Sequence, residues 1–153
     1  MILDDIRFIP QSIPFKKRYQ TASHSCLTRD SIIIQVQSGD YLGYGEAAPL
    51  AGYSPETMEN CMNVLNGIQQ QLAGQTIGAG PFNHLPPKTI KSPAAVFGME
   101  TAIIDLISKV QQIPFATYLN PQYSPTVPVN FLYTGYPPKQ YGKYTVKLKI
   151  GIK

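Results

Sequence analysis

Residues 29–50, RDSIIIQVQSGDYLGYGEAAPL, contain the clearest β-hairpin signal in the chain. A β-branched run, SIIIQV, is followed by the turn sequence SGD and by a second short strand, an order typical of a hairpin. Upstream, residues 4–15 (DDIRFIPQSIPF) indicate a further strand that Pro10 and Pro14 break, which places it at the edge of a sheet. Together these segments predict a three-stranded antiparallel meander. The polar, aperiodic residues 16–28 (KKRYQTASHSCLT) between them are expected to form a mobile loop.

A helix is expected directly after the hairpin. In YSPET, Ser54 is a suitable N-cap and Pro55 suits the first helical position. One apolar stripe then recurs at intervals of three and four residues up to Gly74, and its members are Met58, Cys61, Leu65, Ile68 and Leu72. This helix is expected to pack one face on the meander.

A second helix is predicted after a Gly/Pro-rich connection over residues 75–91. Ser92 and Pro93 repeat the cap-then-proline start, and residues 94–109 (AAVFGMETAIIDLISK) are apolar around most of the helix. Such a helix is buried on more than one side. Gly98 in its middle is unfavourable for a helix, so we expect a neighbouring element to approach closely there.

Two more strands are expected near the C-terminus. Residues 126–133 (TVPVNFLY) predict a buried strand, and residues 144–151 (YTVKLKIG) predict another. The ten residues between them are just short of a usual parallel crossover. We therefore place a domain change near Pro125, with an antiparallel domain over 1–125 and the start of a strand-helix-strand series over 126–153.

Composition narrows the class of protein. The chain has 153 residues, the size of one domain, and 14% of them are charged against a typical ~25%. Its apolar runs are far shorter than the ~20 residues that span a bilayer, and no signal-peptide pattern opens it, so a cytoplasmic protein is expected. Cys26 and Cys61 lack CxxC spacing, which favours free thiols over a disulfide or a metal site.

Four stretches, in this order, resemble the enolase superfamily and, within it, the o-succinylbenzoate synthase family. They are TRDSIIIQV, GYGEAAPLAGYSPET, SPAAVFGMETAIIDL and the lysine pair in KLKIG, and together they span nearly the whole chain. The second is the most specific for this family, whereas KLKIG is shared with muconate cycloisomerases and dipeptide epimerases. The resemblance implies an α+β fold: an N-terminal capping domain of a three-stranded meander plus helices, followed by a (β/α)8 barrel whose first two strands lie in 126–153.

The resemblance also implies a function in menaquinone biosynthesis. The family's enzymes are Mg²⁺-dependent lyases that remove a proton α to a carboxylate and eliminate water to form o-succinylbenzoate. Lys149 would be the acid/base and Lys147 its electrostatic support, on one face of a strand. In the cap, His24 and the loop carrying Leu50 and Tyr53 would contact the small carboxylate substrate.

The barrel of this family needs about 200 residues or more, so the chain is expected to be truncated. The family's metal ligands and opposing lysine would lie beyond Lys153, and no Asp or Glu present matches their positions. We therefore expect no metal ligand on this chain, and no activity from the chain alone.

Three alternatives remain open. The enzyme could be a dipeptide epimerase, an N-acylamino acid racemase or a muconate cycloisomerase, which use the same lysine pair. The chain could instead be a non-catalytic, cap-like interaction module, because an alternating lysine pair by itself is typical of a solvated strand face. Nucleic-acid binding by the C-terminal lysines and tyrosines is disfavoured, since the net charge is only +4 and no RNP, KH or zinc-finger signature is present.

Overall fold

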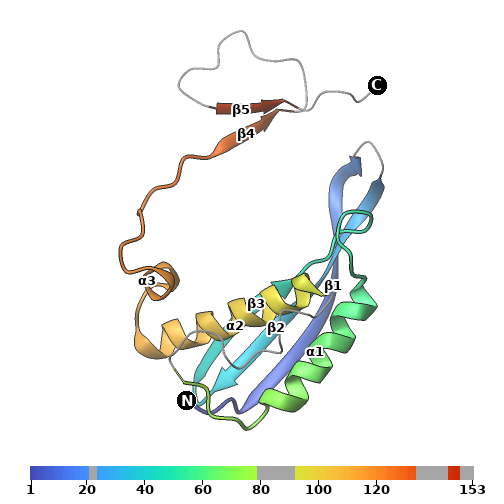
Figure 1. The fold of residues 1–153 in the computed structure, drawn as a ribbon. Coiled ribbons are helices and arrows are strands. Elements are labelled where there is room, and N and C mark those ends of the chain that lie inside the picture. Colours follow the sequence, from blue (N-terminus) through green and yellow to red (C-terminus); the bar gives the residue numbers. More distant parts are fainter. Residues whose placement is uncertain (21–23, 79–91, 134–144, 149–153) are drawn as a thin grey trace.

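The computed structural model describes residues 1–20, 24–78, 92–133 and 145–148 of the chain (Figure 1). Its elements are β1 (Asp5–Gln20), β2 (Ser25–Ser38), β3 (Tyr41–Ala47), α1 (Met58–Leu72), α2 (Pro93–Gln111), α3 (Phe115–Leu119), β4 (Asn130–Tyr133) and β5 (Thr145–Leu148). In the described part of the chain, no helix is both long and apolar enough to cross a bilayer.

The first three strands form an antiparallel sheet in the order β1-β2-β3, which confirms the predicted meander. The β2–β3 hairpin closes at the pair Ser38–Tyr41, with Gly39 at φ 54° in the turn. This is a left-handed conformation that glycine adopts without steric penalty. The turn therefore fixes the register that places Ile32, Ile34 and Val36 on the buried face.

The prediction that prolines break the first strand is wrong. β1 continues through both of them, with Pro10 opposite Ile32 and Pro14 opposite Thr28, and its register shifts only between Pro14 and Tyr19. β1 is nevertheless an edge strand, as predicted. At an edge, a proline does not interrupt the ladder where its nitrogen faces away from the neighbouring strand.

The mobile loop predicted over residues 16–28 is also wrong for most of its length. Lys16–Gln20 belongs to β1 and Ser25–Thr28 to β2, with Tyr19 opposite Cys26, while residues 21–23 lie outside the described residues. Backbone pairing does not require alternating polarity, so a polar hairpin extension gives no periodic signal. The Phe15 and Tyr19 rings stack along this extension, with centroids 5.5 Å apart.

α1 packs through the apolar stripe that the sequence predicts. Cys61, Leu65, Ile68 and Leu72 are buried in the core with the inward residues of the sheet, and Met58 is half-buried. The start of this helix differs from the prediction. Its N-cap is Thr57, which exchanges capping-box bonds with Asn60, so Met58 rather than Pro55 is the first helical residue.

α2 begins at Pro93 with Ser92 at the N-cap position, as predicted, and it covers the same face of the sheet as α1 (Figure 1). Gly98 is buried against β3, where an added Cβ would lie 2.8 Å from the backbone nitrogen of Ala47. On the strand side, a Cβ on Gly45 would lie 2.8 Å from the nitrogen of Ala102. The close approach expected at Gly98 is thus confirmed, and glycines on both elements permit it.

β4 and β5 form a separate parallel pair, with Leu132 opposite Lys147. Residues 120–129 lead to it from α3, with a turn at Asn120–Tyr123 and no helix or strand in between (Figure 1). The prediction of a buried strand from residue 126 is wrong for the first four residues: Val127 is 75% and Val129 70% exposed. The apolar run VPV suggested burial, yet no second layer among the described residues covers it.

Candidate functional site

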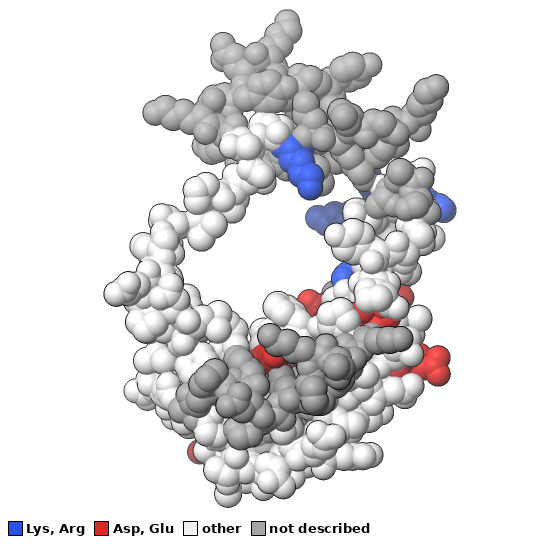
Figure 2. All heavy atoms as spheres, viewed as in Figure 1, with Lys and Arg blue, Asp and Glu red and all other residues white. Residues whose placement is uncertain are grey.

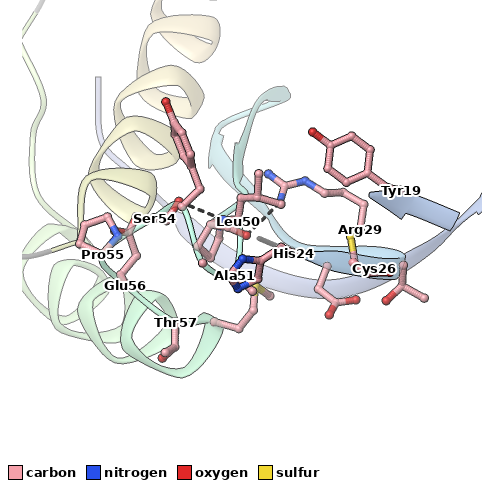
Figure 3. A pocket seen from close by; sticks show the side chains of 17 residues that line it. Tyr19, His24, Cys26, Arg29, Leu50, Ala51, Ser54, Pro55, Glu56 and Thr57 are labelled. Atoms are coloured by element: carbon pink, nitrogen blue, oxygen red, sulfur yellow. Dashed lines mark hydrogen bonds between the residues drawn. The ribbon is translucent and has the colours of Figure 1, made fainter. Parts of the chain in front are cut away.

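A pocket of about 840 Å³ opens at the end of the sheet where the β1–β2 hairpin extends beyond the helices (Figure 3). One wall is formed by Tyr19 and by residues of the segment 24–30 around the start of β2. The other wall is the loop Pro49–Thr57, which connects β3 to α1. The first wall includes His24 and the second includes Leu50 and Tyr53, which are the three residues expected to contact substrate.

The two walls meet at Gly52 and His24. Gly52 has φ +76°, and a Cβ added to it would overlap the imidazole ring of His24. Glycine is therefore required there both by the left-handed backbone and by the packed ring. This contact brings His24 beside the loop that carries Leu50 and Tyr53, so the structure gathers all three predicted cap residues around one pocket. Their role as substrate contacts stays a prediction.

The pocket loop is held as a tight turn by its own hydrogen bonds. The amides of Tyr53 and Ser54 both donate to the carbonyl of Leu50, at 2.9 and 2.8 Å, and the Leu50 amide donates to the Ser54 hydroxyl at 2.9 Å. Ser54 thus closes this turn instead of capping α1. The turn leaves Tyr53 87% exposed, while Leu50 is half-buried.

Arg29 is a pocket residue to which sequence reasoning assigned no role. Arg29 is drawn in Figure 3: its Nη1 donates to the carbonyl of Pro49 at 2.9 Å, and its Nη2 also donates to the carbonyl of Ala48, which precedes the pocket loop. Its neighbour Asp30 accepts a hydrogen bond from the Ser12 hydroxyl at 2.5 Å. Arg29 lies in the TRDS stretch that resembles the family, but the carbonyls that accept its hydrogen bonds are about twenty residues away. No local sequence pattern identifies them.

Glu56 is a second such residue. It is only 5% exposed, and its Oε1 accepts a 2.7 Å hydrogen bond from the backbone amide of Ala94 in the first turn of α2. The Ser92 hydroxyl instead donates to the Cys61 sulfur, at 3.4 Å. Burial raises the pKa of the Cys61 thiol, and the Glu56 carboxylate adds to this effect. Cys61 is therefore a protonated core residue at neutral pH.

The predicted catalytic lysines lie on or next to β5. Lys147 is exposed on this strand, whereas Lys149 lies outside the described residues, so the common face predicted for the pair stays a prediction. Figure 2 shows Lys and Arg side chains gathered toward β5 and the tip of the β1–β2 hairpin, while the Asp and Glu side chains seen in this view lie nearer the helices. Within the described residues, no group of three or more His, Cys, Asp or Glu side chains is placed to hold a metal ion.

Comparison with solved structures identifies the class of this fold. A dipeptide epimerase from Enterococcus faecalis, complexed with Mg and the dipeptide L-Leu-L-Tyr, superposes with a TM-score of 0.74 over 87% of this chain and 38% of its own, at 21% identity. A muconate lactonizing enzyme from Pseudomonas fluorescens, complexed with muconolactone, gives a TM-score of 0.73 over 86% and 37%, also at 21% identity. At this identity the likeness shows the fold alone, which is the capping-domain fold of the enolase superfamily.

The family follows from sequence comparison. Residues 9–106 match the family described as MenC, N-terminal domain, and the chain belongs to this family. The o-succinylbenzoate synthase of Yersinia enterocolitica is 26% identical over 96 residues, which are 62% of this chain and 27% of that protein. The chain therefore spans about a quarter of the length of the curated relatives that it matches.

Proposed function

We propose that this chain is the N-terminal part of an o-succinylbenzoate synthase-like lyase of menaquinone biosynthesis. In this proposal residues 1–125 form the capping domain, and residues 126–153 form the first two strands of the barrel. The family match over residues 9–106 supports the first part, and the parallel pairing of β4 with β5 supports the second. The observation that carries the proposal is Lys147 on β5, the strand that would be barrel strand two.

The chemistry proposed for this strand is proton transfer by an amine. Lys149 takes the proton α to the substrate carboxylate, and the same group then assists the departure of hydroxide, so that the products are o-succinylbenzoate and water. A lysine with a reference pKa of ~10.4 is mostly protonated at neutral pH. A second ammonium group two residues away, that of Lys147, favours the neutral form of Lys149 by charge repulsion.

Magnesium enters this proposal only for the whole enzyme. The Enterococcus faecalis neighbour is complexed with Mg, yet the described residues of this chain offer no cluster that fits a metal ion. None of the described residues is therefore proposed to hold the ion. The cap residues His24, Leu50 and Tyr53 are proposed to contact the non-reacting part of a small carboxylate substrate, because they line the same pocket.

A dipeptide epimerase is the second candidate, since solved structures with that activity share the fold. Epimerisation would use the same lysine to remove the α-proton but would return a proton instead of eliminating water. The two candidate enzymes act on different substrates, so activity assays with both kinds of substrate distinguish them.

The test is an assay of the enzyme that contains this chain with 2-succinyl-6-hydroxy-2,4-cyclohexadiene-1-carboxylate, in parallel with dipeptides and N-acylamino acids. Dehydration of the first compound is expected, and Lys149→Ala should abolish it. Lys149→Arg keeps the positive charge but cannot release a proton near neutral pH, so it should be equally inactive. Lys147→Ala should retain some activity, with the pH profile moved upward because the repulsion is lost.

Two results would contradict the proposal. Turnover of a dipeptide or an N-acylamino acid without dehydration would replace it by the epimerase or racemase reading. Full activity of Lys149→Arg would remove the acid/base role of this residue. The 153 residues assayed alone are expected to show no turnover.

A further inference from the structure

The chain leaves the sheet directly after β3. The last paired residues of β2 and β3 are Ile32 and Ala47. The next two residues on the β3 side are Ala48 and Pro49, and the loop of the pocket begins there. Proline has no backbone N–H, so it cannot donate to β2 if the ladder continues. The chain therefore departs from the sheet in a region that is still shielded from solvent, since Pro49 is buried and Ala48 half-buried.

This departure leaves two carbonyl groups that need partners. A buried backbone carbonyl without a hydrogen bond is unfavourable, because its interaction with water is lost. Arg29 supplies both bonds from the neighbouring strand: Nη2 donates to Ala48 and Nη1 to Pro49. A planar guanidinium presents two N–H groups side by side, which matches two successive carbonyls. The Arg29 side chain thus supplies hydrogen bonds at the position where the backbone pairing between β2 and β3 ends.

We propose that Arg29 is a positioning residue that holds the loop Pro49–Thr57 in its pocket-forming conformation. Arg29 belongs to the wall formed by the start of β2 (Figure 3), and one of its two acceptors, Pro49, is the first residue of the opposite wall. Directly after them comes the turn closed by Ser54, with Leu50 at its beginning. Arg29 therefore anchors the loop at its first residues, while the contact of His24 with Gly52 lies further along it.

The consequence for ligands concerns the shape of the pocket rather than a contact with the reacting atoms. Leu50 and Tyr53 lie within five residues of the anchored carbonyls, so a shift of the anchor moves both of them. A pocket that is already formed binds its ligand without first ordering a loop. Arg29 thus acts on affinity through the loop. This last step rests on the proposed function, whereas the anchoring itself does not.

Hydrogen exchange of backbone amides tests the anchoring without any assay of activity. The readout is the exchange rate of the Leu50, Tyr53 and Ser54 amides, which donate only within the turn. In Arg29→Ala these three amides should exchange at least about ten-fold faster, because local opening becomes easier. Arg29→Lys should give an intermediate exchange rate, since a single ammonium group cannot present two N–H groups side by side to the two carbonyls.

The matched control is Arg7→Ala, which removes an arginine from the same sheet. Arg7 is exposed and pairs with Asp5, away from the pocket. It should leave the loop amides unchanged. The amide of Cys61, which donates to Thr57 in the first turn of α1, should stay protected in every variant. Unchanged loop exchange in Arg29→Ala would overturn the proposal, and so would an equal rise at Cys61, which would indicate general destabilisation.

The effect on ligands is measured in the active enzyme. Arg29→Ala should raise KM by about ten-fold or more while kcat changes by less than about three-fold, because the loss is in binding rather than in the chemical step. A loss confined to kcat would overturn the effect proposed on affinity. If the wild-type enzyme turns over none of the substrates tested, the proposed function fails, and the exchange experiment still decides the anchoring.

Discussion

α1 and α2 cover the same face of the sheet, but they reach it in different ways (Figure 1). α1 contributes a stripe of side chains, with Leu65 and Ile68 almost wholly buried. α2 also buries side chains, Met99 and Leu106 among them, but at Gly98 its backbone lies directly against that of Ala47 in β3. Side chains at an interface can change rotamer to accommodate an added atom. Two backbones in direct contact cannot, so an added atom must push them apart. The two helices should therefore respond differently to the same small change.

The two helices also differ in how their first turns are capped. α1 is capped locally, because Thr57 and Asn60 bond to each other's backbone amides. At α2 the cap residue Ser92 makes no capping bond with its side chain, and a carboxylate oxygen of Glu56 accepts from Ala94 instead. A negative charge near the first turn also interacts favourably with the helix dipole. The start of α2 thus depends on a residue 38 positions away in the chain, whereas the start of α1 is capped by its own neighbouring residue.

The largest contrast is expected from the same substitution in the two helices. Gly98→Ala should lower the free energy of unfolding by about 3 kcal/mol, because the new Cβ meets the backbone of β3. Gly67→Ala in α1 should raise it by about 0.5–1 kcal/mol, since nothing lies within 4 Å of an added Cβ and alanine favours helix. Urea unfolding followed by circular dichroism measures both. Effects of the same sign would remove the distinction between the two interfaces.

An intermediate effect is expected from the carboxylate that links the pocket loop to α2. Glu56→Ala should lower the free energy of unfolding by about 2 kcal/mol, because a buried bond from a backbone amide to a charged acceptor is lost. Glu56→Gln should be milder, since its amide oxygen can still accept. The control is Glu59→Ala, an exposed carboxylate in the first turn of α1. If the Glu59 change equals the Glu56 change, the link to α2 has no special weight.

The smallest effect separates the two cap residues. Thr57→Ala should lower the free energy of unfolding by about 1 kcal/mol, the usual effect of losing an N-cap bond. Ser92→Ala should change it by only a few tenths of that amount, because the Ser92 hydroxyl makes a long bond to sulfur and no capping bond. Equal losses measured by the same urea titration would show that Ser92 caps α2 after all.

Local signals in the sequence predicted several elements of the fold correctly. The hairpin over residues 29–50, the apolar stripe of α1 and the tight approach at Gly98 were all predicted and confirmed. The same reasoning misplaced the cap of α1 at Ser54 and made a loop of the polar hairpin extension. In both cases several local patterns compete, and the contacts that choose among them are made in the folded chain.

The site divides in the same way. The family resemblance of the sequence selected His24, Leu50, Tyr53, Lys147 and Lys149, whose roles stay predictions, and the enolase-superfamily capping fold is confirmed. Only the tertiary structure revealed that His24 packs on Gly52. The same is true of the hydrogen bonds that Arg29 donates to two carbonyls of the neighbouring segment, and of the bond that Glu56 accepts from the first turn of α2. The physical reason is distance along the chain: periodicity and turn preferences act over a few residues, whereas the partners of Arg29 and Glu56 are about 20 and 38 residues away.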